Sequence, residues 1–394
     1  MTQPKTSATL TPAEFRSMKQ TLNNRSAASR GRKLDRSFAF DLPGDIGIKL
    51  NNGCNLRCKH CFEWNPDGYH HEFERQEARR EIDFALIERI FEETRPFRSR
   101  MYLWGGEPLI YSKFDELCEL LASDPRISTI CTNAVLVEPK LESLLKLPEG
   151  VTLLASLEGF EAENDAIRGR GTFRKVMSAI ELLLERKRAG EFRGDVSVSL
   201  TINDAMVTRL YDFMEFFEEV GVNSVYFVFP WYIPEEVAER MDTYFAEHFG
   251  WLEAARRDAE AGKKSWHSFT YHLSPDNIEP LLAEMEKLRS RVWKNRIRFQ
   301  PALEPDEVRS FVLGTDRPGM GRTECLALST RMDVLPNGKM NPCKFFPEFT
   351  AADLRDGSLK DVFHGDGYQK HREALACGLT PVCSKCVLLY NNGA

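Results

Sequence analysis

The chain has 394 residues, a formal net charge of −6 at pH 7 and ten cysteines. This length allows one large domain and a smaller one, and the dispersed basic residues do not indicate nucleic-acid binding. There is neither an apolar stretch of membrane-spanning length nor an apolar signal core at the N-terminus, so we expect a cytoplasmic protein without membrane contact. The cysteines of such a chain indicate metal or redox chemistry rather than a disulfide framework.

The first 36 residues are basic, polar and poor in acidic side chains. This composition weakly resembles an organellar transit peptide. However, Thr11-Pro12-Ala13-Glu14 also has the pattern of a helix start, with a capping box and a proline at the first helical position. We therefore expect residues 1–43 to be an N-terminal basic extension with a short helix.

From residue 46, short apolar runs alternate with longer runs of helical periodicity. Such alternation indicates a parallel sheet covered by helices. Right-handed crossovers would curl six strand–helix units into an α/β fold, a partial (β/α)6 TIM-like barrel over residues 44–232. The expected strands are Ile46–Leu50, Arg100–Trp104, Ile127–Thr132, Val151–Ser156, Val196–Thr201 and Ser224–Phe229, and the expected helices lie near 83–94, 113–122, 138–146, 172–189 and 206–220.

The strand–helix pattern stops at Pro230-Trp231-Tyr232-Ile233-Pro234. We expect residues 233–321 to form a helical insert and bridge, whose aromatic patch at 266–272 either contacts substrate or packs in a core. Residues 322–394 hold five cysteines and few regular elements, which predicts a small module stabilised by metal.

Three cysteines follow the first expected strand: Cys54, Cys58 and Cys61. Three thiolates can hold three corners of a cubane iron–sulfur cluster and leave the fourth iron open to a ligand. A structural zinc site that includes His60, or three inert buried thiols, would fit the same residues. The asymmetric spacing favours a cluster, because zinc ribbons usually pair two Cys-x-x-Cys knuckles.

A second motif, Leu103-Trp104-Gly105-Gly106-Glu107-Pro108, ends the second expected strand. The glycines would let a ligand approach the backbone, and the proline would leave strand carbonyls unpaired. Taken alone, the motif could equally be a simple turn from strand to helix.

With both motifs in place, the chain resembles the radical S-adenosylmethionine (radical SAM) superfamily. In that family the three cysteines bind a 4Fe–4S cluster, and its open iron chelates the amino and carboxylate groups of SAM. One electron then cleaves SAM into methionine and a 5′-deoxyadenosyl radical, which removes a hydrogen atom from an unactivated carbon. The protein supplies orientation and a closed site.

The resemblance also implies roles for individual residues. His60 would pack near adenine, and Phe62 would offer backbone groups to the adenine edge. The turn Gly105-Gly106-Glu107-Pro108 would hold the SAM amino group. Ser156 would bind the SAM ribose or carboxylate, and Arg168 would pair with the carboxylate, for which a planar guanidinium is suited.

Two positions depart from the family's pattern. Glu158, in Ser156-Leu157-Glu158-Gly159, replaces the usual aspartate, and Thr132-Asn133-Ala134 replaces Thr-Asn-Gly after the third strand. Neither position belongs to the cysteine motif, so the departures affect local contacts rather than the class.

The C-terminal cysteines resemble the auxiliary-cluster module called SPASM, and more so its shorter form, the Twitch domain. The full module uses seven cysteines for two clusters, whereas this segment has five. The resemblance implies one auxiliary 4Fe–4S cluster, with Cys377 as a spare that could replace one ligand; a four-cysteine zinc site is the alternative. The expected ligands are Cys325, Cys343, Cys383 and Cys386.

The expected function is that of a radical SAM oxidoreductase or crosslinking enzyme acting on a small natural-product intermediate or a short peptide. The auxiliary cluster would accept an electron, and a flavodoxin or ferredoxin-type protein would donate one. The alternatives are a maturase of ribosomally made peptides with a separate leader-binding partner and, from another class, a non-catalytic zinc or iron–sulfur scaffold.

The catalytic residues are unknown from the sequence. Candidates for proton removal are His267, Tyr271, His272 and Glu304, and nothing in their spacing selects among them. The two remaining cysteines, Cys118 and Cys131, are expected to be buried packing residues.

Overall fold

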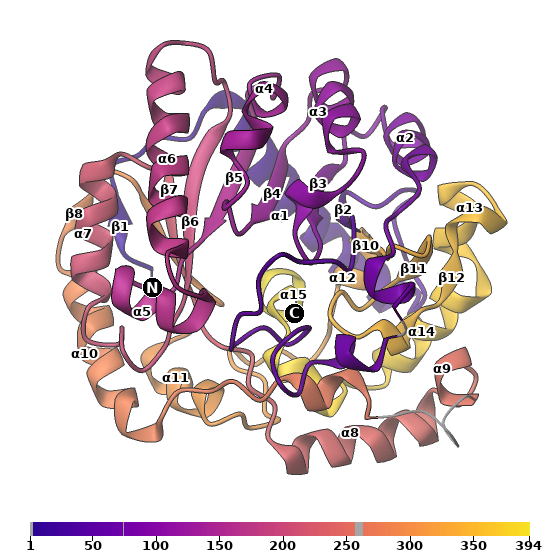
Figure 1. The fold of residues 1–394 in the computed structure, drawn as a ribbon. Helices are drawn as coiled ribbons and strands as arrows, with labels where there is room; N and C mark the ends of the chain where they lie inside the picture. Colours follow the sequence, from indigo (N-terminus) through magenta and orange to yellow (C-terminus); the bar gives the residue numbers. More distant parts are fainter. Residues whose placement is uncertain (1–2, 74, 257–262) are drawn as a thin grey trace.

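The computed structural model describes residues 3–73, 75–256 and 263–394 (Figure 1). Within these ranges, no helix is long and apolar enough to cross a membrane. The architecture is a curved sheet with helices on its outer side, as expected for an α/β partial barrel (Figure 1).

The main sheet has ten strands in the order β12-β11-β10-β2-β3-β4-β5-β6-β7-β9. Its pairings from β10 through β9 are all parallel. The carboxyl ends of these strands therefore meet at one rim, where sites gather in such folds. The strands are β2 Asp45–Lys49, β3 Arg100–Trp104, β4 Ser128–Thr132, β5 Val151–Ser156, β6 Asp195–Thr201, β7 Ser224–Val228, β9 Arg296–Gln300, β10 Arg331–Val334, β11 Lys339–Asn341 and β12 Ala352–Asp353.

The helices that cover the sheet follow the predicted strands in chain order. The longer ones present an apolar stripe to the sheet: α7, for example, buries Leu210, Phe213, Met214 and Phe217, one face of a helix of period 3.6. All six predicted strands and the five predicted helical stretches are present within a few residues. The helices are α2 Phe84–Glu93, α3 Phe114–Ser123, α4 Leu141–Leu144, α5 Glu161–Arg168, α6 Thr172–Arg188 and α7 Leu210–Val220.

Four strands, β9 to β12, extend the sheet beyond the six predicted, and two of them pair directly with predicted strands. Strand β9 of the bridge pairs with β7, and β10 of the C-terminal segment pairs with β2. Both pairings join segments far apart in the chain, and local periodicity carries no information about such partners. The sheet is therefore continuous across the expected boundary at residue 322.

The N-terminal helix is longer than expected. Helix α1 runs over Pro12–Leu34, 23 residues, so the expectation of a short helix is wrong. The predicted capping box is confirmed: the Thr11 side chain accepts a hydrogen bond from the Glu14 N–H. Near the other end of α1, buried Arg32 pairs with Glu324 at 2.7 Å and donates to the Cys325 carbonyl. These contacts tie the extension to the C-terminal segment.

The insert and the C-terminal segment contain more regular structure than the sequence indicated. Rings from the two segments, among them Phe245, Phe249, Trp266 and Phe349, pack in a second core beside the rim. The aromatic patch at 266–272 thus contributes residues to a packed core, which is the second of its two expected roles. The insert and bridge form α8 Glu235–His248, α9 Glu253–Arg256, α10 Ile278–Arg289 and α11 Pro305–Val312, and the C-terminal segment adds α12 Ala327–Thr330, α13 Leu359–His364, α14 Asp366–Ala376 and α15 Val387–Asn392. A short parallel pair, β1 Lys5–Thr6 with β8 Val292–Trp293, completes the fold.

Candidate active site

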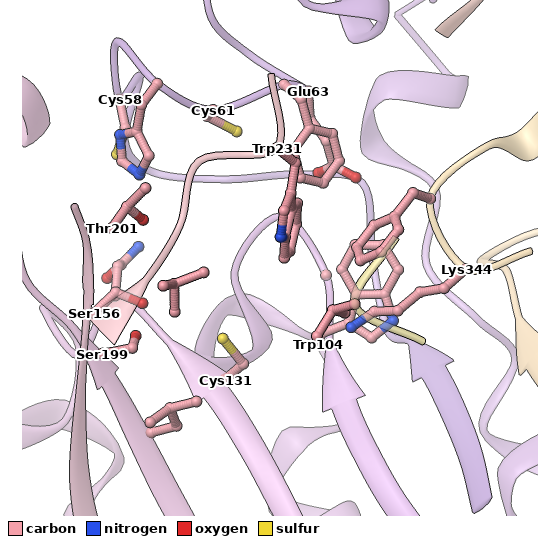
Figure 2. A pocket seen from close by; sticks show the side chains of 18 of the residues that line it. Cys58, Cys61, Glu63, Trp104, Cys131, Ser156, Ser199, Thr201, Trp231 and Lys344 are labelled. Carbon is pink, nitrogen blue, oxygen red and sulfur yellow. The ribbon is translucent and has the colours of Figure 1, made fainter. Parts of the chain in front are cut away.

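A cavity of about 440 Å³ opens at the carboxyl ends of the parallel strands (Figure 2). It has the size and mixed apolar and polar lining typical of small-molecule sites. Its walls come from the cysteine loop, the strand ends, the insert and the C-terminal segment. The predicted site residues among its lining are Cys54, Cys58, His60, Cys61, Phe62, Gly105, Gly106, Glu107, Ser156 and Arg168. Pro108 is buried behind this wall and does not line the cavity.

The three cysteines of the loop after β2 lie together on the cavity wall as free thiols. Burial raises the pKa of Cys54 and of Cys61 to about 12, and it raises the pKa of Cys58. The thiols therefore stay protonated until a metal displaces the protons, because only thiolates are ligands. Three neutral thiols that lie on one cavity wall, and that form no disulfide, are suited to bind an iron–sulfur cluster.

His60 does not join these thiols as a fourth ligand. Its Nε2 atom lies 3.1 Å from the Glu158 carboxylate, while its buried Nδ1 atom has no hydrogen-bond partner among the described residues. In the described part of the chain, no group of three or more His, Cys, Asp or Glu side chains is placed to hold a single metal ion. A cubane cluster holds its thiolates on separate iron corners, so the loop remains suited to a cluster.

The two glycines after β3 allow the cysteine loop to approach this turn. A Cβ atom on Gly106 would lie 2.1 Å from the Gly53 carbonyl oxygen, and one on Gly105 would lie 2.5 Å from Asn51 Oδ1. The Gly106 N–H donates to the Asn51 carbonyl oxygen at 2.9 Å. The glycines thus make room for the protein's own backbone as well as leaving the turn open to the cavity.

The Glu107 carboxylate forms its hydrogen bonds with other groups of this protein. It is 1% exposed and accepts hydrogen bonds from the Leu109 N–H, the Thr132 hydroxyl and the Asn133 N–H. Burial raises its pKa, and these bonds oppose the rise. The carboxylate therefore holds the turn after β3 against the end of β4.

Glu158 holds together two residues that the sequence assigned to SAM. Its Oε1 atom lies 2.5 Å from Arg168 Nη2 and 3.1 Å from His60 Nε2. Burial alone raises the pKa of this carboxyl, but the nearby His60 and Arg168 outweigh burial and lower the pKa. Arg168 Nη1 also lies 3.8 Å from Cys58 Sγ, which places the guanidinium beside the cysteine loop.

Aromatic rings cover the cavity where the insert meets the cysteine loop. The ring of Phe62 stacks on Phe269, with centroids 4.6 Å apart, and lies 6.0 Å from Trp231. His60 meets the edge of Tyr271 at 5.7 Å. The insert therefore closes this side of the cavity and limits the entry of water.

Of the four candidates for proton removal, Tyr271 lines the cavity, but burial raises its pKa and keeps its hydroxyl protonated. His267 lies 2.9 Å from Asp242 and 3.3 Å from Glu235, away from the cavity lining. His272 and Glu304 do not line it either. None of the four therefore has the position and protonation state of a base in this cavity.

The sequence did not point to several side chains of the inner cavity. Cys131, expected to be buried rather than at the rim, is half-buried and lies on the cavity wall, so that expectation is wrong (Figure 2). Cys118 is buried in α3 as expected. The alternation of inward-facing and outward-facing residues along each strand would have indicated several of these side chains. It does not indicate Lys344, because this residue lies in the loop after β11. The additional lining residues labelled in Figure 2 are Glu63, Trp104, Cys131, Ser199, Thr201, Trp231 and Lys344.

The C-terminal cysteines are brought together as well. Burial and then the neighbouring Cys383, Cys386 and Cys325 raise the pKa of Cys343, so these four side chains are close to one another. Burial and then the neighbouring Cys386 and Cys383 raise the pKa of Cys325 to about 12. Cys377, by contrast, is exposed at the end of α14. The four thiols fit an auxiliary cluster, with Cys377 outside the group.

Comparisons with known proteins agree with this geometry. Residues 48–214 match the radical SAM superfamily, and residues 325–387 match the SPASM iron–sulfur cluster-binding domain. The chain therefore contains a region similar to the radical SAM superfamily, followed by a region similar to the SPASM domain. Its two domains imply a 4Fe–4S cluster that binds SAM and auxiliary iron–sulfur chemistry in the C-terminal segment. The radical SAM match covers strands β2 to β6 and thus most of the cavity rim.

Curated relatives resemble this chain over part of their length. The mycofactocin maturase MftC of Mycolicibacterium smegmatis is 30% identical over 163 residues, 41% of this chain and 39% of the relative. The pre-heme d1 synthase of Dinoroseobacter shibae is 26% identical over 180 residues, 45% of this chain and 41% of the relative. The chain thus matches less than half the length of these relatives.

Solved structures show the same fold over more of the chain. Streptococcus suis SuiB bound to the precursor peptide SuiA covers 92% of this chain and 72% of its own, with a TM-score of 0.56 and 16% identity. The enzyme anSMEcpe with bound AdoMet and a Cp18Cys peptide covers 89% and 88%, with a TM-score of 0.53 and 18% identity. At these identities the likeness concerns the fold alone.

Proposed function

We propose that this chain is a radical SAM oxidoreductase or crosslinking enzyme that acts on a peptide. The observation that carries the proposal is the convergence on one cavity of the cysteine loop, the Gly-Gly-Glu turn, Ser156 and Arg168. These residues are far apart in the chain and have no reason to share a wall in a purely structural metal site.

Each group has a separate task in binding. Cys54, Cys58 and Cys61 would hold the SAM-binding cluster, and the backbone at Gly105 and Gly106 would receive the SAM amino group. Ser156 and Arg168 are on the wall where the remaining polar groups of SAM would lie. When bound, the reduced cluster and SAM supply a 5′-deoxyadenosyl radical that removes a hydrogen atom from carbon.

The protein's own contribution is orientation and exclusion of water. Phe62 with Phe269 closes the cavity from the insert, and Glu107 holds the turn after β3 in place. Glu158 holds His60 and Arg168 in fixed positions. A rigid, water-poor site protects a reactive species from side reactions.

Cys325, Cys343, Cys383 and Cys386 would hold an auxiliary 4Fe–4S cluster beside the same cavity. Val387 and Leu388, which follow Cys386, line the cavity directly. An electron released from a substrate would therefore have a short path to that cluster. A flavodoxin or ferredoxin-type donor would supply the electron that starts the reaction.

A peptide is preferred over a small molecule because similar proteins of this fold are maturases or were solved with peptides. MftC is named a maturase, and SuiB was solved with its precursor peptide. A leader-binding partner encoded separately is compatible with this proposal. A small natural-product intermediate remains the second candidate, because the cavity itself is small.

The proposal is tested by anaerobic reconstitution with iron and sulfide, followed by reduction in the presence of SAM. We expect about eight irons per chain, as two cubane clusters require, and formation of 5′-deoxyadenosine. The triple substitution of Cys54, Cys58 and Cys61 by alanine should abolish that product. Persistence of 5′-deoxyadenosine in the triple variant, or zinc in place of iron, would contradict the proposal.

A second set of variants tests the auxiliary cluster. Substitution of Cys383 and Cys386 by alanine should lose about four irons yet spare uncoupled SAM cleavage. Cys377→Ala is the matched control, because this exposed thiol stands apart from the group, and it should keep all the iron. Iron loss in the control alone would assign the ligands differently.

A further inference from the structure

The ammonium of Lys344 faces the candidate active site without a counter-charge. Lys344 lines the cavity on the side away from Ser156 and Ser199, with its side chain reaching toward Trp104 (Figure 2). The residue is 9% exposed. Among residues 3–73, 75–256 and 263–394, its Nζ atom has neither a hydrogen-bond acceptor nor an ion-pair partner. A charge withdrawn from water in this way calls for an anion.

The neighbours of Lys344 are aromatic faces. Its Nζ atom lies 3.8 Å from the ring centroid of Tyr102 and 5.2 Å from those of Trp104 and Phe345. Such faces attract a cation, but they leave the N–H groups of the ammonium free to donate hydrogen bonds. The rings therefore stabilise the charge in the cavity wall and keep it available to a ligand.

The arginines of the same wall are already neutralised. Arg168 pairs with Glu158 at 2.5 Å, and Arg331 pairs with both oxygens of Asp333 at 2.8 and 2.9 Å. These carboxylates come from the protein itself. Lys344 differs because no carboxylate of the described chain is paired with it, so its N–H groups are available to a ligand that enters the cavity.

We infer that Lys344 binds a carboxylate group of the substrate, and that an apolar or aromatic part of the substrate lies next to that group. One ammonium suits a carboxylate better than a phosphate, because its single positive charge matches the single charge of a carboxylate, whereas a phosphate monoester carries about −1.5 to −2 at pH 7. Trp104 and Lys344 also line a neighbouring cavity of about 630 Å³. The ammonium therefore lies where two cavities adjoin, a position suited to binding one end of a substrate.

The inference rests on the proposed function, because it names a chemical feature of that enzyme's substrate. Two sources of the carboxylate are compatible with the site: the C-terminus of a peptide and an acidic side chain. The probes for the first are N-acetylphenylalanine and its primary amide. The probes for the second are the N-methylamides of N-acetylglutamate and N-acetylglutamine. Each pair differs only in the carboxylate.

The experiment measures binding of each probe to unreduced holoenzyme with SAM by isothermal titration calorimetry. In at least one pair, the acid should bind about tenfold more tightly than the amide, since a hydrogen bond to a charged group typically contributes this much. The pair that discriminates identifies the source of the carboxylate. Equal binding of acid and amide in both pairs, or no saturable binding of any probe, would overturn the inference.

Substitutions of Lys344 test the residue itself. The preference for the acid should disappear in Lys344→Met and remain in Lys344→Arg, which keeps the positive charge. Lys360→Met is the matched control: this lysine of the C-terminal segment pairs with Asp41 and lines neither cavity, and its loss should leave the preference unchanged. A preference that survives in Lys344→Met would overturn the assignment.

The two proposals fail in different ways. Formation of 5′-deoxyadenosine without substrate requires only the cluster and SAM, so it is measured on the unmodified enzyme. Its absence from the unmodified enzyme would contradict the proposed function. Should Lys344→Met fail to bind iron, the acid and amide probes on the unmodified enzyme still decide the inference.

Discussion

The Glu158 carboxylate lies 2.5 Å from the guanidinium of Arg168, and both are buried at the end of β5 and of α5. The same oxygen also contacts His60. The glutamate that departs from the family's aspartate thus connects the cysteine loop to the arginine expected to meet SAM. Its extra methylene gives the carboxylate the reach for both contacts.

Glu158→Gln should destabilise the protein by about 3–5 kcal/mol, because it leaves the buried Arg168 charge without its partner. Added SAM should raise the melting temperature of this variant more than that of the unmodified enzyme, since a SAM carboxylate would supply the missing charge. Glu161→Gln is the control: its pair with Arg174 is exposed, so its loss should cost less than about 1 kcal/mol. Equal stabilisation by SAM in both proteins would argue against contact between Arg168 and SAM.

Gly106→Ala should prevent correct formation of the SAM-binding cluster. The new methyl group would lie 2.1 Å from the Gly53 carbonyl oxygen, and backbone is poorly able to yield. We expect the loss of about four irons per chain and of 5′-deoxyadenosine formation. Gly250→Ala, at an exposed position with its nearest neighbour at 3.4 Å, should behave as the unmodified enzyme. Full iron content in Gly106→Ala would show that the loop can move aside.

Ala134 has a φ of 57° and is buried, in a region that disfavours residues with a Cβ. Replacing it with glycine relieves about 1–2 kcal/mol of strain but loses a buried methyl group and adds freedom to the unfolded chain, about 1–2 kcal/mol together. Chemical denaturation should therefore show a change below about 1 kcal/mol. Ala155→Gly, in extended strand β5, relieves no strain and should cost about 1–2 kcal/mol. Equal costs at the two positions would contradict the strain at Ala134.

His371 should make stability depend on pH. Burial lowers its pKa from 6.5 to about 4, and its Nε2 atom has no hydrogen-bond partner in the described chain. Between these two values, the unfolded chain binds a proton that the folded protein does not. Stability should therefore fall as the pH falls through this window, by up to about 3 kcal/mol.

Thermal unfolding of His371→Gln against pH checks this expectation. The variant should lose that part of the slope between pH 6.5 and about 4. His248→Gln, at an exposed position near the end of α8, should keep the slope of the unmodified protein. A slope unchanged in His371→Gln would assign the pH dependence to other groups.

The sequence by itself determined the local elements and the class of chemistry. Short apolar runs that alternate with helical stretches identified strands β2 to β7, and the capping box at Thr11 identified the start of α1. The cysteine spacing and the Gly-Gly-Glu-Pro turn indicated a cluster and SAM. These features depend on neighbours within a few residues, so periodicity and spacing can reveal them.

Only the tertiary structure decided which distant groups meet. It added β9 and β10 to the sheet and turned the Lys344 ammonium into the cavity. These outcomes depend on strand pairing and side-chain packing between segments that are far apart in the chain. No local pattern encodes them, because the contacts that stabilise them form only when the whole barrel closes.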